Sequence, residues 1–280
     1  MRSIGSTQRR TVAAAATLAI VALCAASLVH AQGGKPHPRA AAPQCDPAAF
    51  RIIVDVGHTP ESPGAISARG VGEYEFNLRL ATVIDGKLRE AGFNRAHLLM
   101  ANGEAIPSLV RRVGQANAMS ADLLISIHHD SVPDVFKSMW EFGGVQRPFS
   151  DKFKGHSIFV SRDNADYDGS LNFAKLLGAR LKARGLVYTP HYHNEPKMGS
   201  RRRPLVDAET GVYRYDQLII LRTTRMPSVL LEAGSIIHPE EEVLMGREEH
   251  QLVIAGAVTE AVETFCALRQ PKTRRAGAQR

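Results

Sequence analysis

Cysteine is scarce in this chain of 280 residues, and outside the two ends neither sign of charge dominates. There are only three cysteines, one tryptophan and no visible internal repeat. Of the 35 Lys and Arg residues, three lie within 1–31 and five within 269–280, which leaves 27 against 28 Asp and Glu. The formal charge of +7 therefore comes from the ends, and the body is near neutral. A basic extension is typical of a solvated, disordered tail, which we expect at 269–280.

The N-terminus has the composition of a secretory signal peptide. Three arginines precede an apolar run over 11–29, and Val29-His30-Ala31 has the small-x-small form of a signal peptidase site. A membrane anchor is the alternative, but the run is rich in alanine, is interrupted by Ser27 and ends at a cleavage motif. We therefore predict that residues 1–31 are a signal peptide and that no stable membrane insertion follows its removal.

The signal also indicates the compartment of the mature protein. Leu23 stands before Cys24, where a lipoprotein signal needs a small residue, so lipidation is not expected. Adjacent Arg9 and Arg10 match a twin-arginine signal but also occur in ordinary signals, so both export routes stay open. We expect a protein secreted across the inner membrane into the periplasm, with no nucleic acid as partner.

The mature chain of 249 residues, Gln32 to Arg280, has ample length for one buried core. Residues 32–49 contain Gly, Pro and Ala without periodicity, and we expect them to form a flexible leader. Strand and helix patterns then continue as far as residue 268. We predict a single catalytic domain over 50–268, working as a monomer.

Two cysteines remain after the signal is removed, Cys45 and Cys266. One stands just before the first apolar run and the other near the end of the last helical pattern, two places that can be neighbours in space. An even number of cysteines in an oxidising compartment favours a disulfide over two buried free thiols. We therefore predict a Cys45–Cys266 bridge.

Apolar runs and helical patterns alternate through the first half of the domain. The runs at 52–54, 96–100 and 122–127 are short enough for buried strands, and helical patterns starting near Glu73 and Ser108 separate them. This order is typical of an α/β sheet with right-handed crossovers.

The second half of the domain continues the pattern less regularly. Its expected strands are at 156–161 and 228–231, its expected helices at 171–184 and 248–268, and its expected long loops at 131–155 and 188–215. We predict an α/β fold with a mostly parallel, twisted sheet of about six strands flanked by helices.

Polar side chains end three of the apolar runs: His58, His128 and Glu232. Ligands bind an α/β sheet at the carboxyl ends of its strands, and Glu73 at a helix start can reach the same edge. Neutral imidazole and carboxylate are zinc ligands, and two His with one carboxylate leave a fourth position open for water. The remaining glutamate can then serve as general base. These residues therefore favour a catalytic zinc site at the carboxyl ends of the strands.

Three blocks of the sequence resemble a known enzyme family. They are VDVGHTPESPGAISARGVGEYEFNL (54–78), LVRRVGQANAMSADLLISIHHDS (109–131) and LIILRTTRMPSVLLEAGSIIHPEEEVLM (218–245). They are similar, in the same order, to blocks of the zinc-dependent N-acetylmuramoyl-L-alanine amidases found in bacterial cell separation. Together they span nearly the whole mature chain.

The resemblance implies a role for each polar residue at the sheet edge. His58, Glu73 and His128 match the zinc ligands, Glu232 matches the catalytic glutamate, and Asp130 matches a supporting Asn or Asp. The implied reaction is hydrolysis, by a zinc-activated water, of the amide bond between the lactyl group of N-acetylmuramic acid and L-alanine. The implied cofactor is Zn²⁺ and the implied partner is peptidoglycan, while the need for an activator protein stays open.

The sequence departs from the family pattern at three places. His129 stands where a small residue is common and competes with His128 as the ligand, although the Ser-Ile-His match favours His128. Residues 235–238 replace the usual run ending in Ser-Asn, so substrate contacts there are in doubt. Between His128 and Glu232 there is no long regulatory helix, and the polar stretch 188–215 takes its place.

Other polar residues are expected to have no part in the reaction. His156 is interpreted as a packing or edge residue, and His191 and His193 as loop residues, with lining of the cleft as the alternative. Arg201-Arg202-Arg203 is expected to be solvated, the alternative being contact with substrate carboxylates.

Two other functions stay open at this point. One is an inactive relative that grips peptidoglycan or regulates another hydrolase; loss of one of the four site residues would favour it, and all four are present. The other is a different zinc amidohydrolase or peptidase on the same scaffold, which product analysis separates from an amidase.

Overall fold

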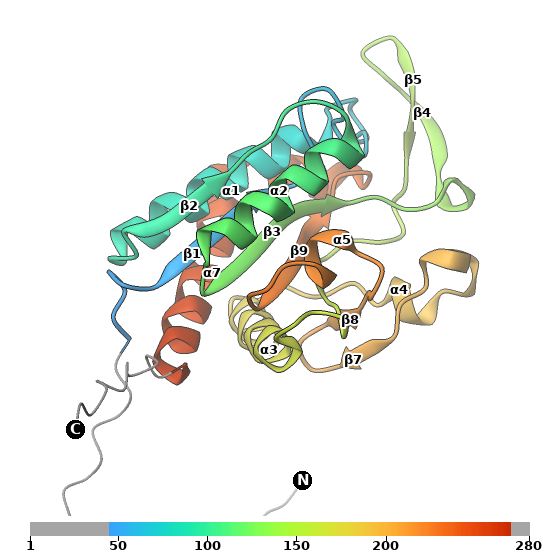
Figure 1. The fold of residues 1–280 in the computed structure, drawn as a ribbon. Helices are drawn as coiled ribbons and strands as arrows, with labels where there is room; N and C mark the ends of the chain where they lie inside the picture. Colours follow the sequence, from blue (N-terminus) through green and yellow to red (C-terminus); the bar gives the residue numbers. More distant parts are fainter. Residues whose placement is uncertain (1–44, 270–280) are drawn as a thin grey trace, which may run out of the picture. The chain divides into compact units, whose positions relative to one another are not determined.

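The computed structural model describes residues 45–269, so the predicted signal peptide, most of the leader and residues 270–280 lie outside the described part. Within residues 45–269, a seven-stranded sheet has the order β2-β1-β3-β9-β6-β8-β7 (Figure 1). Its strands are β1 (Arg51–Val56), β2 (Arg95–Leu99), β3 (Leu123–Asp130), β6 (Ser157–Val160), β7 (Leu205–Asp207), β8 (Val212–Arg214) and β9 (Ser228–Ser235).

Most neighbouring strands of this sheet are parallel. This holds for β2, β1, β3 and β9 and for β6 with β8, whereas β6 runs antiparallel to β9 and β7 antiparallel to β8. The predicted α/β domain with a mostly parallel sheet is confirmed, with seven strands instead of about six. As a consequence, β1, β3 and β9 all end at the same edge of the sheet.

Helices cover both faces, because side chains along each strand point alternately to opposite sides. Ile52 and Val54 belong to the core on one face and Ile53 to the core on the other. The first core includes residues of α1 (Glu73–Glu90), α3 (Tyr167–Ala183) and α7 (Glu248–Leu268), and the second includes residues of α2 (Ala105–Met119) and α5 (Ile219–Arg222).

Two segments predicted as long loops contain regular structure, so that prediction was wrong. Residues 131–155 include the turn η1 (Asp134–Phe136) and a hairpin of β4 (Ser138–Phe142) and β5 (Val145–Phe149), which projects away from the sheet (Figure 1). Residues 188–215 include α4 (His191–Asn194), η2 (Pro196–Arg201), β7 and β8. These elements are short, so they lack the periodic apolar pattern by which longer ones are predicted.

The predicted helix boundaries agree with the structure at Glu73, where α1 begins, and along α7, but not at the starts of α2 and α3, since α3 begins at Tyr167 instead of residue 171. Helix α2 begins at Ala105 with Glu104 at its N-cap, so the predicted helix start near Ser108 was wrong. Ser108 lies inside the helix, where its hydroxyl donates to the Ala105 carbonyl at 2.8 Å.

The structure contains the predicted Cys45–Cys266 disulfide, with the two Cα atoms 5.1 Å apart. It ties the start of the described chain to the last turn of α7. By length and composition α7 could also cross a membrane, but it packs against α1 and α3 and half of that stretch is buried. Its apolar residues therefore belong to the core.

Candidate metal centre

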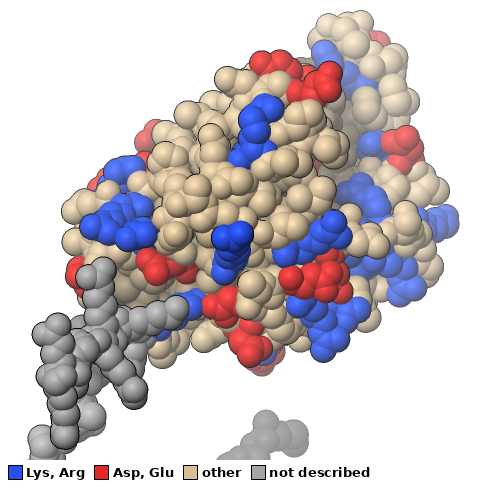
Figure 2. Space-filling view, in the orientation of Figure 1, with Lys and Arg blue, Asp and Glu red and all other residues tan. Residues whose placement is uncertain are grey.

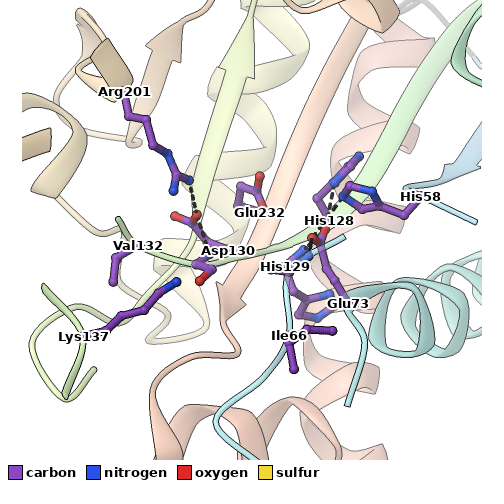
Figure 3. Close-up of a pocket in the computed structure, with 12 residues that line it drawn as sticks. His58, Ile66, Glu73, His128, His129, Asp130, Val132, Lys137, Arg201 and Glu232 are labelled. Carbon is purple, nitrogen blue, oxygen red and sulfur yellow. Dashed lines mark hydrogen bonds and ion pairs between the residues drawn. The ribbon is translucent and has the colours of Figure 1, made fainter. Parts of the chain in front are cut away.

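Two imidazoles and one carboxylate meet at the carboxyl edge of the sheet. His58 follows β1, His128 lies near the end of β3, and Glu73 is the first residue of α1. Nε2 of His58 is 3.0 Å from one oxygen of Glu73, and Nδ1 of His128 is 2.9 Å from the other. The three candidate ligand atoms lie within 4.8 Å of one another (Figure 3). The structure thus brings together the three residues that the sequence predicts as ligands.

Two glycines leave the space that this group occupies. A Cβ added to Gly57 would lie 2.5 Å from two ring atoms of His128, and one added to Gly64 would lie 2.5 Å from the Glu73 carboxylate. His58 itself has a φ of +67°, an unusual value for a residue other than glycine. Backbone strain of this kind concentrates at functional sites, where the surrounding structure holds it.

The protonation states of the group suit a metal ion, which binds ionised carboxylate and neutral imidazole. Burial opposes ionisation of Glu73, but hydrogen bonds from His128 and His58 outweigh it and hold its pKa well below the ordinary value. Burial also lowers the pKa of His128, although contact with Glu73 opposes the shift. Two His and one carboxylate are the donor set of catalytic zinc sites, so these residues fit zinc.

His129, the competing ligand in the sequence, points away from this group. Its ring hydrogen-bonds to Oδ1 of Asn77 at 2.8 Å and packs on Phe76, and burial lowers its pKa to about 3. Asn77 also donates to the Glu73 carboxylate at 3.1 Å, as does the His129 backbone N–H at 3.2 Å. Asn77 and His129 therefore both bind Oε1 of Glu73, whereas His58 contacts Oε2.

Glu232 lies beside the group without a fixed partner. It stands next to His128 in the parallel register of β3 and β9. Its Oε2 is buried and has no hydrogen-bond partner among residues 45–269. Burial, followed by the nearby charges of Asp130 and Glu73, raises the pKa of Glu232 well above its ordinary value. A free, weakly acidic carboxyl at this place can accept and return a proton.

Asp130 forms a second, separate group at the end of β3. Its Oδ1 accepts a hydrogen bond of 2.7 Å from the Tyr192 hydroxyl and lies 3.4 Å from Nη2 of Arg201. Burial raises its pKa to about 6, against the opposing charge of Arg201. His191, predicted as a loop residue, is buried with Nε2 3.5 Å from Asp130, whereas His193 is exposed.

A buried ion pair beneath the site was not predicted from the sequence. Nη1 of Arg112 donates to both oxygens of Asp55, at 2.9 and 2.8 Å, and the Ser126 hydroxyl donates to the same carboxylate at 2.6 Å. These contacts join α2 to β1 and β3 just before their functional ends. The signal was available in the sequence, because an aspartate inside an apolar strand needs a buried partner.

The metal group opens into a cavity of about 370 Å³. The cavity is also lined by Asp130, Glu232, Lys137 and Arg201, and Figure 3 shows the last two on the side away from His58. Arg201, expected to be solvated, keeps a partly exposed side chain that also borders the site.

A cluster of two His and one Glu beside a free carboxylate is typical of metal-dependent hydrolases. A profile of the N-acetylmuramoyl-L-alanine amidase family matches residues 52–264. The chain belongs to this family, which confirms the prediction made from the three sequence blocks.

Individual relatives agree with this assignment. The amidase AmiC of Neisseria meningitidis serogroup B is 25% identical over 222 residues, which are 76% of this chain and 52% of that protein. The present chain thus spans about half the length of that curated relative. The crystal structure of the amidase Ami1 from Mycobacterium smegmatis has a TM-score of 0.58 at 19% identity, covering 79% of this chain and 98% of Ami1. The CwlD amidase from Clostridioides difficile, solved in complex with the GerS lipoprotein, has a TM-score of 0.56 at 19% identity, covering 78% and 99%.

Proposed function

We propose that this chain is a zinc-dependent amidase that cuts peptidoglycan between the lactyl group of N-acetylmuramic acid and L-alanine. The observation that carries the proposal is the group of His58, Glu73 and His128, with ligand atoms within 4.8 Å of one another beside Glu232. The family and its relatives supply the substrate class. The presence of all four residues argues against an inactive relative.

In this proposal His58, Glu73 and His128 hold the zinc ion. When bound, zinc supplies a Lewis acid that acidifies water and polarises the scissile carbonyl. Glu232 takes a proton from the water while the water oxygen bonds to the amide carbon. It then gives the proton to the nitrogen of L-alanine as the C–N bond breaks. The raised pKa of Glu232 suits a carboxyl that must both accept and donate a proton near neutral pH.

Digestion of purified peptidoglycan, with and without a chelator and read by mass spectrometry, tests the proposal. We expect stem peptides with a free L-alanine amine, bare glycan strands, and loss of both products with chelator until zinc is restored. Cuts within the peptide would indicate a different zinc peptidase. No cut by the zinc-loaded protein would indicate a binding or regulatory relative.

The compartment and the partners are part of the same proposal. Residues 1–31 direct export to the periplasm, 32–49 act as a leader, 269–280 act as a basic tail, and the mature protein works as a monomer. The complex of the CwlD amidase with the GerS lipoprotein supports a protein partner for this chain too. The N-terminus of the exported protein, determined by mass spectrometry, and its mass in solution by light scattering test these points.

A further inference from the structure

Two cations border the cavity on the side away from the metal group. Arg201 is the last residue of η2, and Lys137 directly follows η1. Figure 3 shows both side chains pointing into the cavity, with Asp130 and Glu232 between them and the His58–Glu73–His128 group. The cavity therefore has a metal end and a cationic end.

Arg201 is held in place, but not all of its N–H groups are hydrogen-bonded. Its Nη2 lies 3.4 Å from both Oδ1 of Asp130 and the Tyr192 hydroxyl, at the long limit for hydrogen bonds. Oδ1 of Asp130 already accepts a short bond from Tyr192. The other guanidinium N–H groups of Arg201 have no hydrogen-bond partner among residues 45–269, and its side chain is 41% exposed. These donors are free to meet an anion.

Lys137 is similarly free to change partners. Its Nζ lies 2.9 Å from Oδ1 of Asp134, three residues earlier. Because the Asp134 side chain is 97% exposed, the pair is solvated and contributes little to holding the lysine. A ligand anion inside the cavity can therefore compete for it.

The two arginines that follow Arg201 contact other residues, outside the cavity. Arg202 donates to the backbone carbonyl of His193 at 2.9 Å, and Arg203 lies 3.6 Å from the ring centroid of Tyr215. Neither lines the cavity. Figure 2 shows Lys and Arg side chains interspersed with Asp and Glu on the face that it draws, and residues 32–268 carry 27 Lys and Arg against 28 Asp and Glu, so a general basic field does not explain the placement of Arg201.

We propose that Arg201 and Lys137 form an anion subsite that binds a free carboxylate of the stem peptide while the scissile amide lies at the metal group. The inference rests on the proposed amidase function. The residue that follows L-alanine in a stem peptide carries an α-carboxyl group that is either free or amidated. A guanidinium group pairs with the planar, charged carboxylate but not with the neutral carboxamide. The enzyme therefore prefers peptidoglycan with the free acid at this position.

The test uses two synthetic substrates that differ in one group: N-acetylmuramoyl-L-alanyl-D-glutamate with its γ-carboxyl blocked as a methylamide, and the same compound amidated at the α-carboxyl. For the zinc-loaded protein we expect kcat/KM to be about tenfold higher for the free acid. This is the lower end of what a charged hydrogen bond provides, because Asp130 offsets part of the charge of Arg201. Calorimetry with the two released dipeptides should show the same preference in Kd.

Variants decide which residues cause the preference. Arg201→Gln should bring both ratios, kcat/KM and Kd, close to one, and Lys137→Met should reduce them. Arg202→Gln is the matched control and should keep the wild-type preference. Melting temperature and zinc content, measured for each variant, separate loss of the subsite from damage to the fold.

Each failure has a distinct meaning. If the wild type cuts both substrates equally, or if Arg201→Gln keeps the preference, the subsite is wrong and the amidase function stands. If the zinc-loaded wild type cuts neither substrate, the proposed function is wrong and the subsite is refuted with it. A lower melting temperature of Arg201→Gln with an unchanged preference would make Arg201 a structural support of Asp130 only.

Discussion

Replacing Glu232 by glutamine should separate catalysis from metal binding. Glutamine keeps the shape of the side chain and one carbonyl oxygen, but it cannot accept a proton at neutral pH. Because Oε2 of Glu232 has no hydrogen-bond partner among residues 45–269, the substitution breaks no bond to that atom. We therefore expect Glu232→Gln to fold and to bind zinc like the wild type.

The expected loss is in turnover. A general base contributes about 10² to 10⁴ in rate, which is about 3 to 5 kcal/mol in the activation free energy. Asp130 is the carboxylate that lines the cavity besides Glu232 and the candidate ligand Glu73, and it is engaged by Tyr192 and Arg201, so it is a poor substitute. We expect kcat to fall at least 10²-fold, measured by chromatography of a muropeptide substrate, with zinc measured by mass spectrometry on the same sample.

The same variant should change how stability depends on pH. Burial, followed by the charges of Asp130 and Glu73, raises the folded pKa of Glu232, so the folded protein keeps this proton to higher pH than the unfolded chain. Ionisation therefore costs stability as the pH rises from the ordinary value of 4.5 through the folded pKa. In metal-free protein, Glu232→Gln should raise the melting temperature at pH 8, and the difference from wild type should shrink toward pH 5.

Several results would refute this reasoning. A variant that arrives without zinc would make Glu232 a ligand and leave the general base to Glu73 or His129. Full activity with metal present would exclude the mechanism, and a lower melting temperature at pH 8 would contradict the electrostatic account. Glu240→Gln, which changes an exposed glutamate at the start of α6 (Pro239–Met245), is the matched control and should alter none of these quantities.

Three further predictions follow from the geometry. His128→Ala should lower zinc content and abolish activity, whereas His129→Ala should lower the melting temperature and keep most of both; the opposite pattern would make His129 the ligand. Gly57→Ala should push the His128 ring aside and weaken zinc binding about 10- to 100-fold, while Gly86→Ala, in an open position on α1, should leave zinc affinity unchanged and slightly stabilise the protein. Thiol titration of the unfolded mature protein should find no free cysteine before reduction. Reduction should lower the free energy of unfolding by at most about 5 kcal/mol, since the closed loop is long, and two thiols before reduction would remove the bridge.

The metal group was predictable because the hydrophobic pattern of the sequence places each of its residues at the end of a strand or the start of a helix. His58 and His128 end buried strands and Glu73 opens a helix, so knowledge of the strand order is enough to bring them to one edge. The choice between His128 and His129 was not decided by this pattern. It depends on Asn77, whose side-chain oxygen hydrogen-bonds to the His129 ring and so keeps that ring away from the metal group.

Arg201 was not predictable in the same way. It lies in a stretch whose strands, β7 and β8, are three residues long, and its position follows from the contact of Tyr192 with Asp130, 62 residues earlier. The sequence indicates that Asp55, inside an apolar strand, needs a buried partner, but it does not identify that partner as Arg112, which lies 57 positions away. Contacts between distant polar side chains leave no periodic mark on a single sequence, so they appear only with the tertiary structure.

The disulfide makes residues 45–266 a closed covalent ring, and every residue of the candidate site lies on it. The tip of the β4–β5 hairpin, Gly143-Gly144, is exposed and is the kind of place where a protease cuts first. A single cut there would divide the three ligand residues from Glu232 and Arg201. In the oxidised protein the two pieces would remain one molecule, joined through Cys45 and Cys266, whereas in the reduced protein only noncovalent packing would keep the two halves of the site together.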